Sequence, residues 1–573
     1  MFYQHNLLYG KCVTFGAFPL NKNLLYPYPK KVDICLKDLL SDISDFNNLD
    51  SKGKDNKIFI GFSSSNPSGY QRTPFWLSTE AISKHILIGG SIGSGKTSLT
   101  YRLLSGALAN FGSVIIGEAK GGLKGYSEGA AFTDLSLYLN RKLGAKYYRF
   151  PRGNCWFNPL LYLESAEERK SFMYMISNSI EVESGDYKAY INRAAKIASL
   201  ILEIINISCT DENKRKFLTL RQLSKCLKDP NYLQEEIINI IASQSKLDEV
   251  NKLKKELKSL NKSQDKANKI NKLKRELELL NFFALAKEEG RDRFVMTATG
   301  INFFLDAIDS EDLFYYTEPN ETGRDIQKIK LVELKIDDVL YEKTLVVISQ
   351  PLSDPRSKVV GPIFWDTLLN RVLQLGPYPP RKNGLEREKV AVFLDETHRL
   401  PVGELGKSGD FLRQYNIGLI EITPSIIDSE RWEQNKHIYQ TLISLSPGVT
   451  DVLQLIHDRL PNSVQTTFQV TPEIALDNYN DIRINPKIES TQNIPELQDN
   501  PGISVRSMRN TGKFTALLHT SQIGDESGLF WIDLESPLLA HFEALVKEAL
   551  HPSEGEEAAR ILDYALGLSC EYS

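Results

Sequence analysis

The sequence predicts an α/β fold with a mostly parallel, doubly wound sheet that is interrupted by an all-α insertion domain. Three observations indicate this fold. A phosphate-loop pattern lies between a short apolar run and a helical segment. Fully apolar runs, which are typical of parallel strands covered on both faces, occur before residue 164 and again after residue 327. Residues 164–327 show mainly helical periodicity.

The first part of the core is expected over residues 57–163, after an N-terminal region of residues 1–56 that is aromatic and Pro-rich early and polar near its end. Short apolar runs separated by helical segments predict strands that alternate with helices. The expected strands are Lys57–Phe62, Gln71–Leu77, Ile86–Ile88, Ser113–Glu118 and Lys146–Phe150.

The all-α insertion is expected over residues 164–327. Apolar residues recur at spacings of three and four in Ser165–Ile180, Tyr187–Ile207 and Leu218–Leu227. Two similar charged segments, 250–261 and 270–281, continue the helical pattern, and both a helical hairpin and one long helix fit them. They form either a solvated pair of helices or a docking arm that contacts a partner or DNA.

The second part of the core is expected over residues 328–573. The apolar runs Thr344–Ser349, Val390–Leu394, Ile417–Thr423 and Ile443–Leu445 predict its strands. The tail from about residue 460 has strand candidates at Phe514–Leu518 and Gly528–Ile532 and a final helix near Ala540–Leu550. Part of this tail is expected to complete either the sheet or a subunit interface.

The phosphate-loop pattern G-x-x-x-x-G-K-[ST] fixes a ligand class, a nucleoside triphosphate with Mg²⁺. Its glycines allow the backbone to approach a polyphosphate, and its N–H groups form an anion-binding nest at a helix N-terminus. Lys96 is expected to reach the β- and γ-phosphates, and the Thr97 hydroxyl to bind Mg²⁺. Nine consecutive residues make up the expected nucleotide site: Gly90, Ser91, Ile92, Gly93, Ser94, Gly95, Lys96, Thr97 and Ser98.

Two acids follow the predicted strand Val390–Leu394. Because the carboxyl ends of parallel strands face the bound ligand, Asp395 is expected to hold Mg²⁺ through water. Glu396 is expected to polarise the attacking water. A multi-subunit motor also needs a cation supplied by a neighbouring subunit, and Arg413 is the first candidate, with Arg399 and Arg356 as alternatives. Together these motifs predict a RecA-like P-loop NTPase core with ATP and Mg²⁺ as its ligands.

Composition restricts the remaining possibilities. The 69 Lys and Arg nearly balance the 73 Asp and Glu, so any contact with nucleic acid must be local. No apolar run reaches the length of about 18 to 20 residues that a membrane span requires. The six cysteines lack C-x-x-C spacing, which indicates reduced thiols in the cytoplasm rather than a zinc site.

In their order along the chain, these motifs resemble the TraG/TraD-type coupling proteins of conjugation and type IV secretion, in the HerA/FtsK branch of P-loop motors. The resemblance covers about residues 57–465. It includes the entry into the phosphate loop and four further segments: Ile116–Gly122, Phe157–Tyr162, the Asp395–Glu396 strand and Arg413–Gly418. Glu118 stands where the family usually has Asp, and Pro424 where it usually has Gln.

The resemblance implies a homohexameric ring that threads DNA and translocates it by hydrolysing ATP. It also implies a relaxase or secretion-channel proteins as partners, and a cytoplasmic location that includes the inner face of the membrane. Two alternatives remain open. One is a nucleotide-gated platform that docks a protein or relaxase partner without processive pumping, and the other is a HerA-like ATPase of phage defence.

Overall fold

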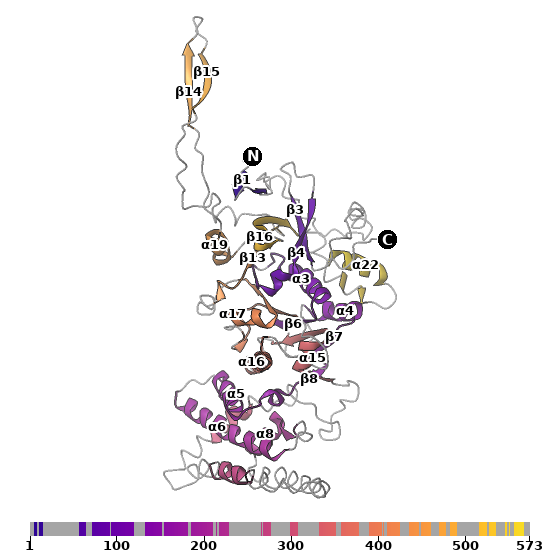
Figure 1. Cartoon of the computed structure of the whole chain (residues 1–573), viewed down its shortest axis with the longest axis vertical. Coiled ribbons are helices and arrows are strands. Elements are labelled where there is room, and N and C mark those ends of the chain that lie inside the picture. The colour runs from indigo at the N-terminus through magenta and orange to yellow at the C-terminus, as the bar shows by residue number, and fades with distance from the viewer. Residues whose placement is uncertain are drawn as a thin grey trace. The chain divides into compact units, whose positions relative to one another are not determined.

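A computed structural model gives the fold of the chain (Figure 1). The chain divides into two compact units. The first consists of Met1–Gly106, Ile422–Ala549 and Ser553–Ser573, and the second of Ala107–Glu421 and Leu550–Pro552. The structure describes residues 5–8, 11–14, 57–64, 72–91, 93–119, 132–151, 154–180, 185–209, 214, 217–228, 265, 267–276, 298–306, 332–350, 357–377, 389–403, 405, 409–424, 435–445, 449–459, 469–476, 482–489, 515–523, 526–534, 545–546, 549–550 and 555–566.

The sheet of the first unit has the strand order β4-β3-β17-β16-β13-β5. β5 pairs with β13 in parallel, and the other neighbours are antiparallel. The two tail strands, β16 and β17, extend this sheet, which is one of the two roles expected for the tail. The strand bounds are β3 Lys57–Ser64, β4 Arg72–Ser78, β5 Ile86–Gly89, β13 Thr441–Leu445, β16 Thr515–Ile523 and β17 Glu526–Asp533.

Helices of the first unit pack on this sheet or connect its strands. α19 (Thr450–Asp458) presents Val452 to β5 so closely that a Cβ on Gly89 would lie 2.8 Å from Val452 Cγ2. α2 (Thr79–Ser83) connects β4 to β5, and the Ser78 hydroxyl caps it by accepting from Glu80 N. α22 (Gly555–Ala565) lies near the end of the chain. Two separate hairpins are β1 (His5–Leu8) with β2 (Lys11–Thr14), and β14 (Gln469–Leu476) with β15 (Ile482–Glu489).

The sheet of the second unit has the order β12-β11-β6-β10-β7, although the last two residues of β12, Ile422 and Thr423, belong to the first unit. β6 pairs in parallel with both β10 and β11. β7 pairs in parallel with β10. Every residue of β6, β10 and β11 is buried, as expected for strands covered on both faces. The bounds are β6 Ser113–Glu118, β7 Lys146–Phe150, β10 Thr344–Ser349, β11 Val390–Asp395 and β12 Ile417–Thr423. These strands confirm the predicted α/β class with parallel central strands.

The described residues between 164 and 327 form helices and no strand, as the periodicity predicted. α5 (Ala166–Ser179), α6 (Gly185–Ser208) and α8 (Leu220–Lys228) lie side by side in this part of the second unit (Figure 1). Residues 267–276 are helical, and Leu273 packs against the core of this unit. A buried ion pair joins α5 to α6, because the Arg169 guanidinium donates to Glu203 Oε2 from Nε at 2.9 Å and from Nη2 at 2.5 Å.

Four further elements of the second unit position its sheet edges. α4 (Thr133–Leu143) precedes β7, and α15 (Ile336–Tyr341) precedes β10. The long helix α16 (Ser357–Leu375) follows β10. The short helix η4 (Pro159–Tyr162) begins at Asn158, whose side chain accepts from Leu160 N and donates to Leu218 O at 2.9 Å. Asn158 thereby ties the predicted Phe157–Tyr162 segment to the start of α8.

Several predicted features lie outside the described residues. They are Ile92 of the phosphate loop, Arg356, residues 120–122, the segment 250–261 and most of the expected final helix at 540–550. The division into an N-terminal region, two core parts and an insertion stays a prediction.

Candidate functional site

The phosphate loop has the predicted strand–loop–helix context. It follows β5 and leads directly into α3 (Lys96–Asn110). Gly93 and Gly95 have φ values of +78° and +97°, in the left-handed region where a side chain would strain the backbone. Gly90 also has no room for a side chain, because a Cβ there would lie 2.6 Å from Ser94 Oγ and 2.9 Å from Leu445 Cβ. The loop therefore has the compact glycine-dependent form that phosphate binding requires.

The side chains of the loop indicate an anionic ligand. Lys96 is buried, and its Nζ donates to Gly90 O at 2.7 Å and to Ser91 O at 2.8 Å, so the ammonium lies inside the loop. Ser94 Oγ is buried and has no hydrogen-bond partner among the described residues. A buried hydroxyl without a partner is costly, and a phosphate oxygen would satisfy it. The Thr97 and Ser98 side chains are half-buried at the start of α3. These residues fit a nucleotide phosphate.

A buried arginine fixes the helix that follows the loop. Arg102 of α3 is fully buried, and its Nη1 donates to Ile60 O at 2.9 Å and to Leu534 O at 3.2 Å. The guanidinium also lies 4.8 Å from the centre of the Phe59 ring. Sequence reasoning missed Arg102, although an arginine inside the apolar stretch Leu99–Leu108 of a core helix was a usable signal.

The acid pair lies at the carboxyl end of β11. Asp395, the last residue of the strand, is buried, and Glu396 begins the following turn with a φ of +58°. Glu396 is half-buried, and its Oε2 lies 3.6 Å from His398 Nε2. The structure therefore brings the two predicted acids together at the edge of the parallel sheet. The phosphate loop belongs to the first unit and the acid pair to the second, so their joint action is part of the proposal below.

A third acid, Glu118, ends the neighbouring strand β6. Its Oε1 accepts from Ser349 Oγ at 2.9 Å and lies 3.9 Å from Arg149 Nη2, and the carboxylate also accepts from the backbone of Phe132. Burial raises the pKa of Glu118 to about 7, against the opposing effects of Arg149 and Ser349, and the nearby charge of Asp395 raises it further. Strands β6, β10 and β11 thus bring Glu118, Ser349 and Asp395 to one sheet edge.

The two described candidate cations, Arg399 and Arg413, lie between strands β11 and β12. Arg413 is exposed in η7 (Arg413–Tyr415), just ahead of β12 and after α17 (Gly409–Leu412). Arg399 is exposed as well, and its Nε donates to His398 Nε2 at 3.0 Å. Exposure does not distinguish the two arginines, so Arg413 as the first candidate and Arg399 as an alternative stay predictions.

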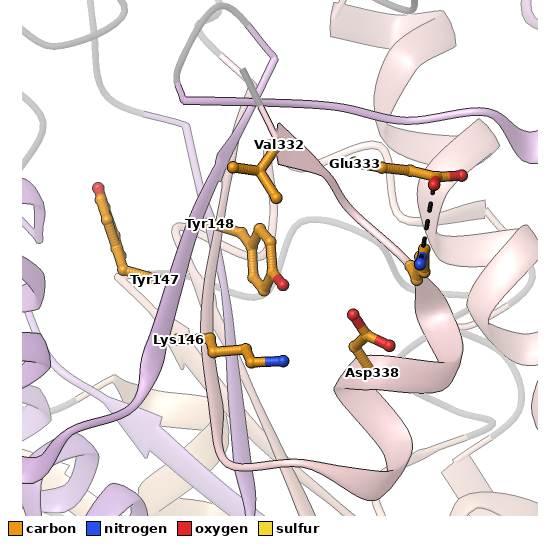
Figure 2. A pocket seen from close by; sticks show the side chains of 7 residues that line it. Lys146, Tyr147, Tyr148, Val332, Glu333 and Asp338 are labelled. Atoms are coloured by element: carbon orange, nitrogen blue, oxygen red, sulfur yellow. Dashed lines mark ion pairs between the residues drawn. The ribbon is translucent and has the colours of Figure 1, made fainter. Parts of the chain in front are cut away.

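A cavity of about 410 Å³ lies at the opposite edge of the second unit's sheet (Figure 2). It includes Lys146 at the amino end of β7 and Asp338 of α15, and Figure 2 shows the Tyr148 ring between them and Val332. Glu333 and Lys335 also line it and form an ion pair of 4.0 Å. The positive charges of its two lysines balance the negative charges of its two acids, so the lining favours neither an anionic nor a cationic ligand. The cavity is separate from the carboxyl ends of β6, β10 and β11.

Among the described residues, no helix has the length and apolar character that crossing a bilayer requires. The same residues also contain no cluster of three or more His, Cys, Asp or Glu side chains that could hold a metal ion.

Of the known proteins compared with this chain, only solved structures are similar to it. No family model matches the chain, and no curated protein matches it. Plasmid coupling protein TrwB in complex with ADP and Mg²⁺ matches at 12% identity and a TM-score of 0.44, over 81% of this chain and 87% of that chain. TrwB in complex with the GTP analogue GDPNP matches at 11% identity and a TM-score of 0.43, over 80% and 87%. VirB4 of Thermoanaerobacter pseudethanolicus matches at 13% identity and a TM-score of 0.35, over 70% and 86%.

Plasmid coupling proteins, the kind of protein that the sequence motifs resemble, are therefore among the structures similar to this chain.

Proposed function

We propose that this chain is a P-loop ATPase that couples ATP hydrolysis to the movement of DNA as a subunit of a homohexameric ring. The observation that carries the proposal is the phosphate loop, with its two left-handed glycines and its buried Lys96. The acid pair that ends the buried strand β11 supports it.

Each residue has a defined role in the proposed reaction. The loop N–H groups and Lys96 bind the phosphates of ATP and stabilise charge on the transferring phosphoryl group. Thr97 and Asp395 would hold Mg²⁺, which would neutralise phosphate charge when bound. Glu396 accepts a proton from water as the water oxygen attacks the γ-phosphorus. The bond from that phosphorus to the bridging oxygen breaks, and ADP and phosphate leave.

Arg413 is proposed to act on the ATP of a neighbouring subunit. Such a cation can contribute about 10³- to 10⁵-fold in rate. Because the residue acts across subunits, Arg413→Ala chains mixed with Glu396→Gln chains should recover hydrolysis, since some interfaces then combine an intact arginine with an intact acid. Each variant alone should hydrolyse ATP at least about 10²-fold more slowly than the wild-type chain.

Two substitutions test the ATPase directly. Lys96→Ala should abolish ATP binding, measured by fluorescent-nucleotide titration. Glu396→Gln should retain binding and reduce turnover by about 10²- to 10⁴-fold. Lys142→Ala and Glu80→Gln, exposed residues on α4 and α2, are matched controls that should leave both properties unchanged. Equal turnover in Glu396→Gln and the wild-type chain would remove Glu396 from the mechanism.

DNA movement requires its own test. Double-stranded DNA should raise the rate of phosphate release, and the stimulation should weaken steeply with salt because a motor grips the phosphate backbone. Mass photometry with ATP should find six subunits. If DNA of any length leaves the hydrolysis rate unchanged at low salt, DNA is not the cargo.

A docking platform without pumping is the second candidate. The observation that favours it is Pro424, which directly follows β12 at the point where Thr423 O accepts from Gly90 N at 3.2 Å. The resemblance places a glutamine there, and proline offers no side-chain amide. Single-molecule tracking on DNA separates the candidates, because sustained directional travel with ATP rejects the platform.

A further inference from the structure

We propose that Gln350 is a positioning residue that holds the turn carrying Glu396, and so sets the rate of hydrolysis without touching the nucleotide. The inference rests on the proposed ATPase function. It names a residue that neither the phosphate loop nor the acid pair includes.

The turn after β11 needs support from its surroundings. Glu396 has a φ of +58°, which for a residue with a side chain costs about 1 to 3 kcal/mol. Local hydrogen bonds close the turn: Arg399 N donates to Glu396 O at 2.8 Å, and Leu400 N donates to Thr397 O at 3.3 Å. The Thr397 hydroxyl donates to Leu394 O at 2.9 Å. The turn then reaches Pro401, where the contact with Gln350 begins.

Gln350 connects three elements of the second unit. It follows β10 directly and is fully buried. Its backbone N donates to Glu118 O at 2.8 Å, at the end of β6. Its side-chain Nε2 donates to Pro401 O at 2.9 Å, and its Oε1 accepts from Trp365 Nε1 of α16 at 3.0 Å. The far end of the turn is therefore bonded to an amide that helix α16 holds in place.

The orientation of the amide follows from the chemistry of its neighbours. The Trp365 indole N–H is only a donor, so it must face the amide oxygen. The Pro401 carbonyl is only an acceptor, so it must face the NH₂ group. A rotated amide would place like groups together at both contacts. Gln350 thus has one favourable orientation, and in that orientation it holds Pro401.

The backbone around Gln350 leaves just enough room for it. A Cβ on Gly361 of α16 would lie 1.7 Å from Gln350 Nε2 and 2.6 Å from Pro401 O. A Cβ on Gly117 of β6 would lie 2.9 Å from Trp365 Cζ2. Glycine at these two positions admits both the amide and the indole, so packing as well as hydrogen bonding fixes the contact.

The test compares Gln350→Met and Gln350→Glu with the wild-type chain. Methionine keeps the length of the side chain and loses both hydrogen bonds. Glutamate keeps the shape and the acceptor for Trp365, and it cannot donate to Pro401 O at a pH high enough to ionise its carboxyl group, so kcat is compared there. Because a small displacement of a catalytic group can cost about 10²-fold, kcat should fall by about 10- to 100-fold in each variant. KM for ATP should stay within about threefold, since the phosphate loop is untouched.

Amide hydrogen exchange supplies a readout that does not depend on ATPase activity. The amides of Arg399 and Leu400 should exchange at least about tenfold faster in both variants, which corresponds to about 1.4 kcal/mol of lost support. Exchange in the phosphate-loop helix α3 should not change. The control is Gln454→Met on α19, which removes an exposed amide that donates to Asp458 at 2.7 Å. It should alter neither kcat nor exchange in the turn.

The outcomes separate this inference from the function beneath it. A wild-type chain that binds ATP and never hydrolyses it overturns the proposed function before any variant is compared. Hydrolysis by the wild-type chain with unchanged kcat in both Gln350 variants overturns the positioning role alone. Unchanged exchange at Arg399 and Leu400 does the same. A fall in kcat with a matching rise in KM points to the binding step and also rejects it.

Discussion

Substituting Glu118 by glutamine should remove a pH dependence of stability that burial creates. The folded-state pKa of Glu118 is raised from 4.5 to about 7, so the unfolded chain releases this proton first as pH rises. Between these two values the unfolded state binds fewer protons than the native state, and stability falls as pH increases. The raised pKa corresponds to about 3 kcal/mol of stability, which is present in full below pH 4.5 and is lost as the pH rises to about 7. Glu118→Gln resembles the neutral form and avoids the loss.

Native-state amide exchange in β6 and β10 can measure this effect, because both strands belong to the same buried sheet. Comparing variant and wild type at the same pH cancels the intrinsic pH dependence of exchange. From about pH 5 to about pH 8, the variant should gain about 3 kcal/mol in free energy of opening relative to the wild type. Ser349→Ala, which removes the hydroxyl that donates to Glu118 Oε1, should extend the window upward. A relative gain below about 1 kcal/mol would refute the reasoning.

Three further predictions concern stability. Arg169→Met should cost up to about 3 kcal/mol, because Glu203 loses its nearer partner and keeps only Lys269, whose Nζ lies 3.7 Å from Oε1; adding Glu203→Leu should recover most of this loss in urea unfolding. Asn158→Ala should lower the free energy of unfolding by about 1 to 3 kcal/mol and speed amide hydrogen exchange at the start of α8. Unchanged exchange there would show that Asn158 does not hold this segment in place. Burial lowers the pKa of His519 to about 4, so stability should fall as pH drops from 6.5 toward 4, and His519→Gln should abolish that fall in thermal unfolding.

The central strands could be predicted from sequence because burial on both faces leaves a plain signal. Ser113–Glu118 and Thr344–Ser349 have the same bounds in the structure as in the prediction, and both are buried throughout. The phosphate loop could be predicted equally well, because its glycines, Lys96 and Thr97 lie within one short segment of the chain. Local chemistry dictates these features, so no knowledge of distant residues was needed.

The buried residues that hold the candidate site in place could not be predicted in this way. Gln350 acts on Pro401, and Arg102 acts on the carbonyls of Ile60 and Leu534; both contacts join residues far apart in the chain. No periodicity encodes such a contact, because the partner is a backbone carbonyl that every residue has. The sequence does show a polar residue within or beside an apolar run. Such a residue marks a position of interest, but the sequence does not reveal its hydrogen-bond partner.

These polar residues have a common physical meaning. Gln350, Arg102 and Arg149 are buried polar side chains, and each makes hydrogen bonds in the interior. An apolar side chain of similar volume would fill the same space without the cost of removing a polar group from water. What only the polar residue supplies is direction, because a hydrogen bond fixes the angle and distance of the backbone that it holds. We infer that the polar residues at these positions lower stability and, in return, place the loop, the turn and the strand ends where the proposed hydrolysis requires them.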